Sequence, residues 1–282
     1  MAKKRRNETD FLNKFTYQSI YDKFRLLAMN AFIWEGLPEG IEERFIEREL
    51  FDHGIAIFFR DPEMSYMCLE AQPSYQLNVY GDPLHYIAYG FNYNKVYSVD
   101  DCVIVENNKN RLPTKPWVHF YAQKLTEAER TMDVNVKACK TPIVFACDDK
   151  DVLTFKRMYQ QVDGNVPAIF ADKMLNTEAI KAFDTKAEFL GNELMNYKKS
   201  VENELLTFLG YNNIPNEKRE RLITDEANSN NQLIKSFFEL QLEARERACE
   251  KINTMYGLNV SVKPRNSVEN SENFVNNLGG VE

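Results

Sequence analysis

The sequence has 282 residues and is acidic, with 35 Lys and Arg against 42 Asp and Glu and a formal net charge of −7. Its 44% hydrophobic and 27% charged residues are typical of a globular protein, and the length suffices for a sizeable core or several subdomains. The negative charge argues against general affinity for nucleic acid, although a local basic patch or a ring around DNA remains compatible with it.

Targeting signals and disulfides are not expected. No apolar run approaches the ~18 residues of a membrane span. The start, MAKKRRNETDF, has basic residues but no apolar segment behind them, so it does not predict a secretory signal. The five cysteines are scattered and odd in number, which favours free thiols in a reducing cytoplasm.

The N-terminal region is expected to begin with two helices. Four basic residues stand on what we expect to be a flexible arm: Lys3, Lys4, Arg5 and Arg6. Asp10 is a candidate N-cap for a helix that runs to about Trp34, and the segment 36–38 (GLP) would end it. A shorter amphipathic helix is expected at 41–51.

Residues 53–121 change to short β-like runs. These runs are GIAIFF, SYMCLE, HYIAYGF and CVIVE. Turn signals at 61–62, 81–83 and 107–110 separate them. The pattern predicts a small, tyrosine-rich β subdomain.

The helical pattern returns at 123–140, and Thr141-Pro142 ends it. Two short apolar runs, PIVFA at 142–146 and PAIFA at 167–171, flank an expected helix at 153–161. Two strands joined by a helix predict a small αβ unit.

The strongest amphipathic stretch is 186–210. Its apolar residues recur at steps of three and four and form one helical stripe: Leu190, Leu194, Tyr197, Val201, Leu205 and Phe208. Gly210 stands where a C-terminal cap belongs. A helix that is polar on its other side needs an apolar partner, so the stretch predicts one stave of an assembly.

A polar loop is expected at 211–230, a helix at 232–256 and a disordered, Asn-rich tail at 264–282. The loop is unusually long for a compact domain. Its basic residues are Lys218, Arg219 and Arg221, and acidic neighbours keep it near neutral.

Catalytic motifs are missing from the sequence. It contains no P-loop, no G-x-G-x-x-G, no G-x-S-x-G and no H-E-x-x-H. The three histidines are far apart, and Cys139 and Cys147 have no neighbouring His, so no zinc site is expected. The acidic run 148–151 could hold a cation, but a solvated loop is the simpler interpretation. We therefore expect no enzymatic activity, no metal and no cofactor.

Seven stretches resemble the upper collar (connector or portal) proteins of small podophages related to phage phi29. They are FIWEGLP (32–38), DPEMSY (61–66), KTPIVFA (140–146), MYQQVDGNVPAIFA (158–171), LLTFLG (205–210), EKRERLITDEANSN (217–230) and RACEKINTMYGLNVSVK (247–263). None is a signature by itself. Their common order over nearly the whole chain argues against chance.

The resemblance implies a mainly α fold with a β-rich subdomain (α+β), built as a wing, a helical stem and a small αβ clip. The wing would comprise 1–123 and 231–263, and the stem helices 124–140 and 186–210. The clip would be 141–185, a channel loop 211–230 and a tail 264–282. About twelve copies would form a ring with a channel at one capsid vertex.

The resemblance also implies partners. Double-stranded DNA would be packaged and ejected through the ring, which would dock a packaging ATPase, through a packaging RNA in some relatives, and later the lower collar and tail proteins. Capsid and scaffolding proteins complete the set, and no membrane is involved. The protein would assemble in the host cytoplasm and remain in the virion.

Residue roles follow by the same resemblance. Stem packing between subunits would use Leu190, Leu194, Val201 and Leu205. The basic arm Lys3–Arg6 would bind an anionic partner, and Lys218, Arg219 and Arg221 would contact DNA. Relatives carry channel lysines near the clip–stem junction, where this sequence has Asp184 and Glu193, while Lys186 replaces an acid.

Two other functions are alternatives. The first is a cellular helical scaffold or adaptor that oligomerises without a channel. The second is a nucleic-acid enzyme, which only the basic arm supports.

Overall fold

The computed structural model describes residues 2–139, 143–145, 180–182, 188–211 and 224–265. For residues 2–9, 138, 143–145, 180–182 and 224–230 it describes the backbone alone. The chain divides into two compact units, Met1–Glu127 with Lys198–Glu282, and Ala128–Tyr197. Helices and antiparallel sheets are both present, which confirms the expected α+β class.

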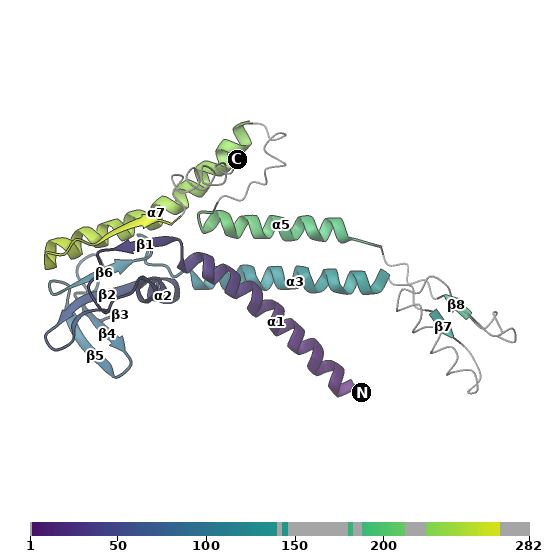
Figure 1. Ribbon diagram of the computed structural model, residues 1–282, viewed down its shortest axis with the longest axis horizontal. Helices are drawn as coiled ribbons and strands as arrows, with labels where there is room; N and C mark the ends of the chain where they lie inside the picture. Colours follow the sequence, from purple (N-terminus) through teal and green to yellow (C-terminus); the bar gives the residue numbers. More distant parts are fainter. Residues whose placement is uncertain (1, 140–142, 146–179, 183–187, 212–223, 266–282) are drawn as a thin grey trace, which may run out of the picture. The chain divides into compact units, whose positions relative to one another are not determined.

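The elements are labelled in Figure 1. The helices are α1 (Ala2–Met29), α2 (Glu43–His53), α3 (Lys115–Cys139), α5 (Gly191–Phe208) and α7 (Thr224–Tyr256). The strands are β1 (Phe32–Glu35), β2 (Ile55–Asp61), β3 (Ser65–Pro73), β4 (His85–Gly90), β5 (Tyr93–Ser98), β6 (Cys102–Glu106), β7 (Ile143–Phe145), β8 (Ile180–Ala182) and β9 (Ser261–Pro264). In the described part of the chain, no helix has the length and apolar character needed to cross a bilayer.

The expected β subdomain is an antiparallel sheet with the strand order β5-β4-β3-β2-β6. Strand β2, between β3 and β6, is buried on both faces, so alternate residues enter two cores. Ala56 and Phe58 face α2 and α7. Ile57 and Phe59 pack instead with residues of β4 and β6. Strand β5 was not expected from the sequence, and none of its residues is buried.

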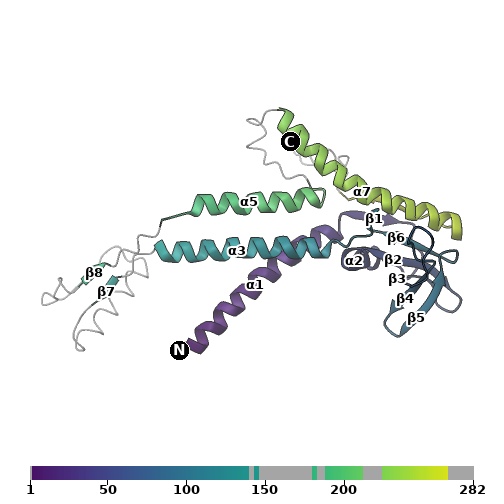
Figure 2. The same cartoon turned by 180° about the vertical axis from the view of Figure 1, so that it is seen from behind.

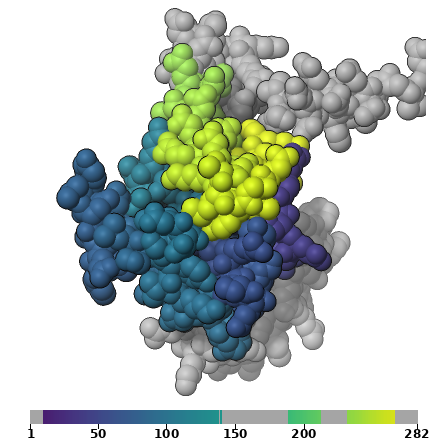
Figure 3. Space-filling model, turned by 90° about the vertical axis from the view of Figure 1, so that its left-hand side faces the viewer, coloured from purple at the N-terminus to yellow at the C-terminus, as the bar shows by residue number. Residues whose placement is uncertain are grey.

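Helix α7 lies against β6 of the five-stranded sheet and against β9, which pairs with β1 in a separate two-stranded sheet. Ala248 and Ile252 of α7 pack in one core with Ile46 and Leu50 of α2. Figures 1 and 2 show α7 running alongside β1 in both views. In Figure 3 the yellow atoms of its C-terminal part lie directly on the teal and blue atoms of the sheet region.

The expected first helix is wrong at its C-terminal end. It ends at Met29, and Phe32–Glu35 forms β1, which pairs antiparallel with β9. Phe32 and Trp34 are buried while their neighbours are more exposed, the two-residue period of a strand. The local sequence did not reveal this strand, because the strand with which it pairs lies near the other end of the chain.

Other helix boundaries also differ from expectation. The backbone of Lys3–Arg6 lies inside α1, so the expected flexible arm is wrong; no Gly or Pro interrupts that helix. Helix α3 begins at Lys115, earlier than expected. Helix α5 begins only at Gly191, and α7 begins at Thr224, inside the expected loop.

The Ala128–Tyr197 unit contains a short antiparallel pair, β7 and β8. Strand β7 confirms the apolar run expected at 142–146. The second expected strand at 167–171, the helix expected at 153–161 and most of the tail expected at 264–282 lie outside the described residues.

Candidate assembly surface on helices α3 and α5

The C-terminal half of α5 packs inside its own chain. Val201 and Leu205 are 3% and 0% exposed, and they share a core with Phe24 of α1 and with Val118 and Leu125 of α3. The expectation that Val201 and Leu205 contact a neighbouring subunit is therefore corrected. Their partners are supplied by helices distant in sequence, which the stripe alone could not reveal.

The end of α5 confirms the predicted glycine cap. Gly210 has a φ of 79°, in the left-handed region that favours glycine. The amide of Tyr211 donates to the carbonyl of Leu206 at 2.8 Å, and the amide of Gly210 donates to Thr207 at 3.1 Å. These bonds satisfy carbonyls that the last helical turn would otherwise leave free.

The other half of the stripe is exposed. Leu190 is 40% exposed and Leu194 is half-buried. Further large apolar side chains of the same unit are also exposed: Val134, Val136, Phe189, Met195 and Tyr197. We call these five, with Leu190 and Leu194, the α3–α5 apolar surface. Val134 and Val136 are two positions apart on α3 and point to different sides of it, so only part of this set can share one face. Exposed apolar side chains that do share a face are typical of an interaction surface.

Asn135 holds the two segments of this surface together. Its side-chain Nδ2 donates to the carbonyl of Glu188 at 2.8 Å, and its Oδ1 accepts the amide of Leu190 at 3.0 Å. Because Val134 and Val136 flank Asn135 in sequence, the two bonds bring the end of α3 close to the start of α5. The amide of Leu194 then donates to Leu190 and begins the helical turn.

The charged candidate residues are only partly described. Lys3, Lys4, Arg5 and Arg6 lie in the first part of α1, residues 2–9, for which the backbone alone is described. Lys218, Arg219, Arg221, Asp184 and Lys186 lie outside the described residues. Glu193 is exposed in the first turn of α5, where a carboxylate is stabilised by the helix dipole. Stabilisation of the helix N-terminus therefore explains an acidic residue at position 193 without any role in a channel.

A depression of about 710 Å³ lies between α7 and β6. Among its lining residues, Arg111 is paired with Glu106 at 2.8 Å and with Asp82 at 3.2 Å. Burial raises the pKa of the Cys102 thiol to about 12, so this thiol is a poor nucleophile at neutral pH. The residues that line the depression therefore assemble no activated nucleophile.

A charged cluster that sequence patterns did not predict surrounds Asp61, at the end of β2. Its carboxylate is buried and accepts hydrogen bonds from Lys95 and Tyr93, both at 2.7 Å. Those bonds hold the pKa of Asp61 well below its ordinary value. Tyr97 donates to the same oxygen at 3.3 Å, so three residues of β5 converge on one carboxylate.

Comparison with known proteins identifies the family. Residues 1–269 match the family described as Phage Connector (GP10). The chain belongs to the phage connector family. The expected head–tail connector function is thereby confirmed, and the cellular scaffold alternative is not favoured. As a phage connector, the protein is a structural component of the virion.

Two solved structures are similar to this chain. A protein in the portal and tail of native bacteriophage P68 is 14% identical, with a TM-score of 0.53 over 94% of this chain and 90% of that chain. An HK97-family phage portal protein from Corynebacterium diphtheriae is 12% identical, with a TM-score of 0.43 over 88% of this chain and 93% of that chain. The P68 likeness confirms that the fold is that of a phage portal protein.

Proposed function

We propose that about twelve copies of this connector form a closed ring at one capsid vertex, and that double-stranded DNA enters and leaves the head through the central channel. The observation that carries the proposal is the family match over residues 1–269. The α3–α5 apolar surface supports it, because rotational closure would cover that surface in every copy.

The parts of the subunit take separate roles in this proposal. Residues 1–123 and 231–263 form the wing, and 124–140 and 186–210 form the stem. The segment 141–185 forms the clip, and the channel loop is the part of the expected loop that precedes α7, residues 211–223. The long helices α3 and α5 span most of the proposed stem, and β7 and β8 fall in the proposed clip.

In this proposal the ring is a passage for DNA and does not itself drive DNA movement. The sequence has no P-loop, so ATP hydrolysis belongs to a separate packaging ATPase that docks on the clip. The lower collar and tail proteins replace the motor when packaging ends, and capsid and scaffolding proteins contact the wing. Assembly takes place in the host cytoplasm before the ring enters the virion.

Electron microscopy of the purified protein tests the proposal. We expect closed rings with a central hole in buffer that contains EDTA and no nucleotide. Native mass spectrometry of the same sample should give one discrete high-order oligomer. A sample that contains only monomers at micromolar concentration would contradict ring assembly by this chain.

The basic segment Lys3–Arg6 is proposed to bind an anionic partner, either a packaging RNA or an acidic face of the motor. A ring repeats the segment around one rim, so weak interactions become multivalent. Alanine at all four positions should weaken RNA binding and flatten the slope of log K against log salt by ~0.7 to 0.9 for each phosphate that is no longer neutralised. Unchanged affinity and slope for RNA and motor would show that the segment is not a binding element.

A further inference from the structure

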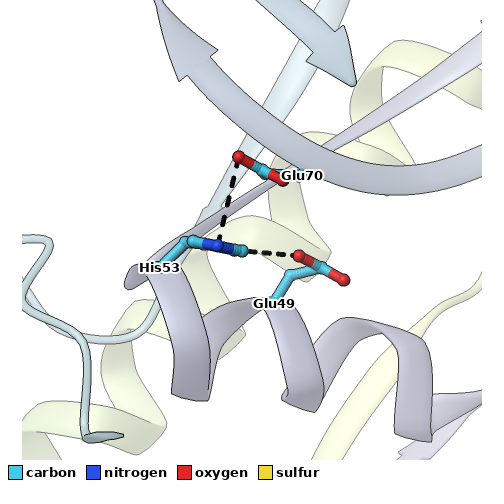
Figure 4. A group of neighbouring side chains, drawn as sticks. All are labelled: Glu49, His53 and Glu70. Atoms are coloured by element: carbon cyan, nitrogen blue, oxygen red, sulfur yellow. Dashed lines mark hydrogen bonds and ion pairs between the residues drawn. The ribbon is translucent and has the colours of Figure 1, made fainter. Parts of the chain in front are cut away.

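Three ligand-type side chains converge between α2 and β3, away from the proposed stem. Glu49 and His53 are one helical turn apart on α2, and Glu70 extends from β3 (Figure 4). One nitrogen of His53 and one carboxylate oxygen from each glutamate all lie within 4.8 Å of one another. His53 Nδ1 is 3.0 Å from Glu49 Oε2, and His53 Nε2 is 4.0 Å from Glu70 Oε1.

Neighbouring side chains orient both carboxylates. Arg48 donates to Glu49 Oε1 from Nε at 2.9 Å and from Nη2 at 2.8 Å, which leaves Oε2 directed at His53. Gln72 donates to Glu70 Oε1 at 2.9 Å. Donors outside a ligand set that fix its carboxylates in this way are characteristic of metal sites.

The backbone holds the histidine in place. His53 is the last residue of α2, and the next residue, Gly54, has a φ of 83° and donates its amide to Leu50. Only 8% of the Glu49 side chain is exposed, at the base of the group, whereas 43% of the His53 side chain is exposed. The group therefore has a buried floor and an open side, through which an ion can enter and water can complete its coordination.

We propose that Glu49, His53 and Glu70 bind a divalent transition-metal ion. Zn²⁺ fits these ligands best and is the ion used in the test. One imidazole and two carboxylates suit Zn²⁺, with water in the remaining position. Ligands on Zn²⁺ lie ~2.0–2.2 Å from the metal, so the 4.0 Å separation of His53 Nε2 and Glu70 Oε1 needs only a small side-chain approach. Mg²⁺ prefers oxygen ligands and retains its water, so this set selects against it.

The ion would join the end of α2 to the middle of the sheet. Both elements already share a core, so the ion adds a polar link beside an apolar one. Because binding requires the folded arrangement, Zn²⁺ should raise the thermal unfolding temperature of the connector. The inference does not depend on ring formation or on DNA passage.

Calorimetric titration of the full-length protein with Zn²⁺ tests the proposal. We expect one Zn²⁺ per chain with at least ~10-fold weaker binding in His53→Gln and Glu70→Gln. The matched control is His119→Gln, which removes an exposed histidine outside the group and should bind as the parent does. The parent should also gain thermal stability with Zn²⁺ but not with equimolar Mg²⁺.

Two further measurements keep the test decisive. Co²⁺ in the same site should give a ligand-field spectrum without thiolate charge-transfer absorption, which separates these ligands from the cysteines. Gln72→Leu leaves all three ligands intact and should weaken Zn²⁺ binding by ~10-fold because Glu70 is no longer held in orientation. No saturable Zn²⁺ binding in the parent, or equal affinity in the parent and His53→Gln, would overturn the proposal.

Discussion

The guanidinium group of Arg245 in α7 meets the carboxylate of Glu47 in α2 through two hydrogen bonds. Arg245 Nε lies 2.8 Å from Glu47 Oε1, and Nη2 lies 2.7 Å from Oε2. Each side chain is 2% exposed. Trp34 of β1 donates to the same carboxylate at 2.9 Å, and Arg245 also donates to the backbone and side-chain oxygens of Asn107 at 3.1 Å each. The pair thus joins α7, α2, β1 and the segment after β6.

Removal of one partner of this pair should be severe. Arg245→Met leaves Glu47 buried without its cation and should lower the free energy of unfolding by about 3–5 kcal/mol. The double variant Glu47→Leu/Arg245→Met should cost clearly less than the sum of the two single variants, because it leaves no uncompensated charge. Urea denaturation of the three variants and the parent measures this coupling.

A surface ion pair provides the control. Lys263 and Glu35 form an exposed pair across β1 and β9, so Lys263→Met should cost less than about 1 kcal/mol. Additive effects of the Glu47 and Arg245 variants would mean that the buried pair is not energetically coupled.

Two positions of the apolar stripe predicted at 186–210 should respond differently to an introduced charge. Val201→Asp places a carboxylate in the core of the subunit and should destabilise the subunit itself by about 3–5 kcal/mol. Leu190→Asp changes an exposed position, so the subunit should fold but fail to form rings. Circular dichroism and native mass spectrometry together separate these outcomes.

The matched control for this experiment is Asn192→Asp, an exposed change at the start of the same helix. It introduces the same charge without altering an apolar side chain and should leave rings intact. Rings formed by Leu190→Asp as readily as by the parent would remove Leu190 from the subunit interface.

Acid should remove the stabilisation that Asp61 provides. Because hydrogen bonds from Lys95 and Tyr93 depress the folded-state pKa of Asp61, its contribution is fully present above the unfolded-state pKa of ~3.9. The contribution disappears as pH falls below that value towards the folded-state pKa. Asp61→Asn should therefore be less stable than the parent at pH 7, and the difference should shrink by pH 3.

Asp100→Asn, a change at an exposed aspartate, controls for general acid effects. Its stability relative to the parent should be nearly independent of pH. The midpoint of urea denaturation at several pH values measures both variants. A constant difference between the parent and Asp61→Asn across this range would contradict the assignment.

Alanine substitution at two glycines with left-handed backbones should separate the cost of backbone strain from the cost of a steric clash. At Gly257 (φ 67°) an added Cβ meets nothing within 4 Å, so Gly257→Ala should cost only the backbone strain of about 1–2 kcal/mol. At Gly210 (φ 79°) a Cβ would lie 2.8 and 2.9 Å from atoms of Phe238. Gly210→Ala should therefore lower the thermal midpoint further than Gly257→Ala, and equal shifts would show that Phe238 moves freely.

The proposed channel loop can be tested by partial deletion within residues 212–223, which lie outside the described residues. The charges of the loop nearly cancel, as suits a gate that touches a sliding duplex without gripping it. Rings and DNA translocation should survive, but packaged DNA should slip out after the motor detaches. Counts of full heads measure how much DNA is retained. Retention equal to that of the parent would argue against a gate. Failure of the variant to form rings would indicate that the loop has a structural role.

Local patterns in the sequence determined much of this subunit. The amphipathic period predicted α2 and the C-terminal part of α5, short β-like runs between turn signals predicted β2 and β6, and Gly210 predicted the helix cap. Each depends on residues within a few positions of one another, so the physical signal is contained in a short segment. The order of the seven resembling stretches indicated the family for a different reason: it spans nearly the whole chain, but it is read directly from the sequence and needs no tertiary structure.

Tertiary structure decided which residues meet. Phe32–Glu35 is a strand only because β9 returns beside it, and Arg245 is buried only because Glu47 receives it. The stripe predicted at 186–210 contains Val201, which the chain covers itself, and Leu190, which lies just before α5 and is left exposed. Periodicity records that a face is apolar but not what covers it, because the covering helices come from distant segments whose approach depends on the whole fold.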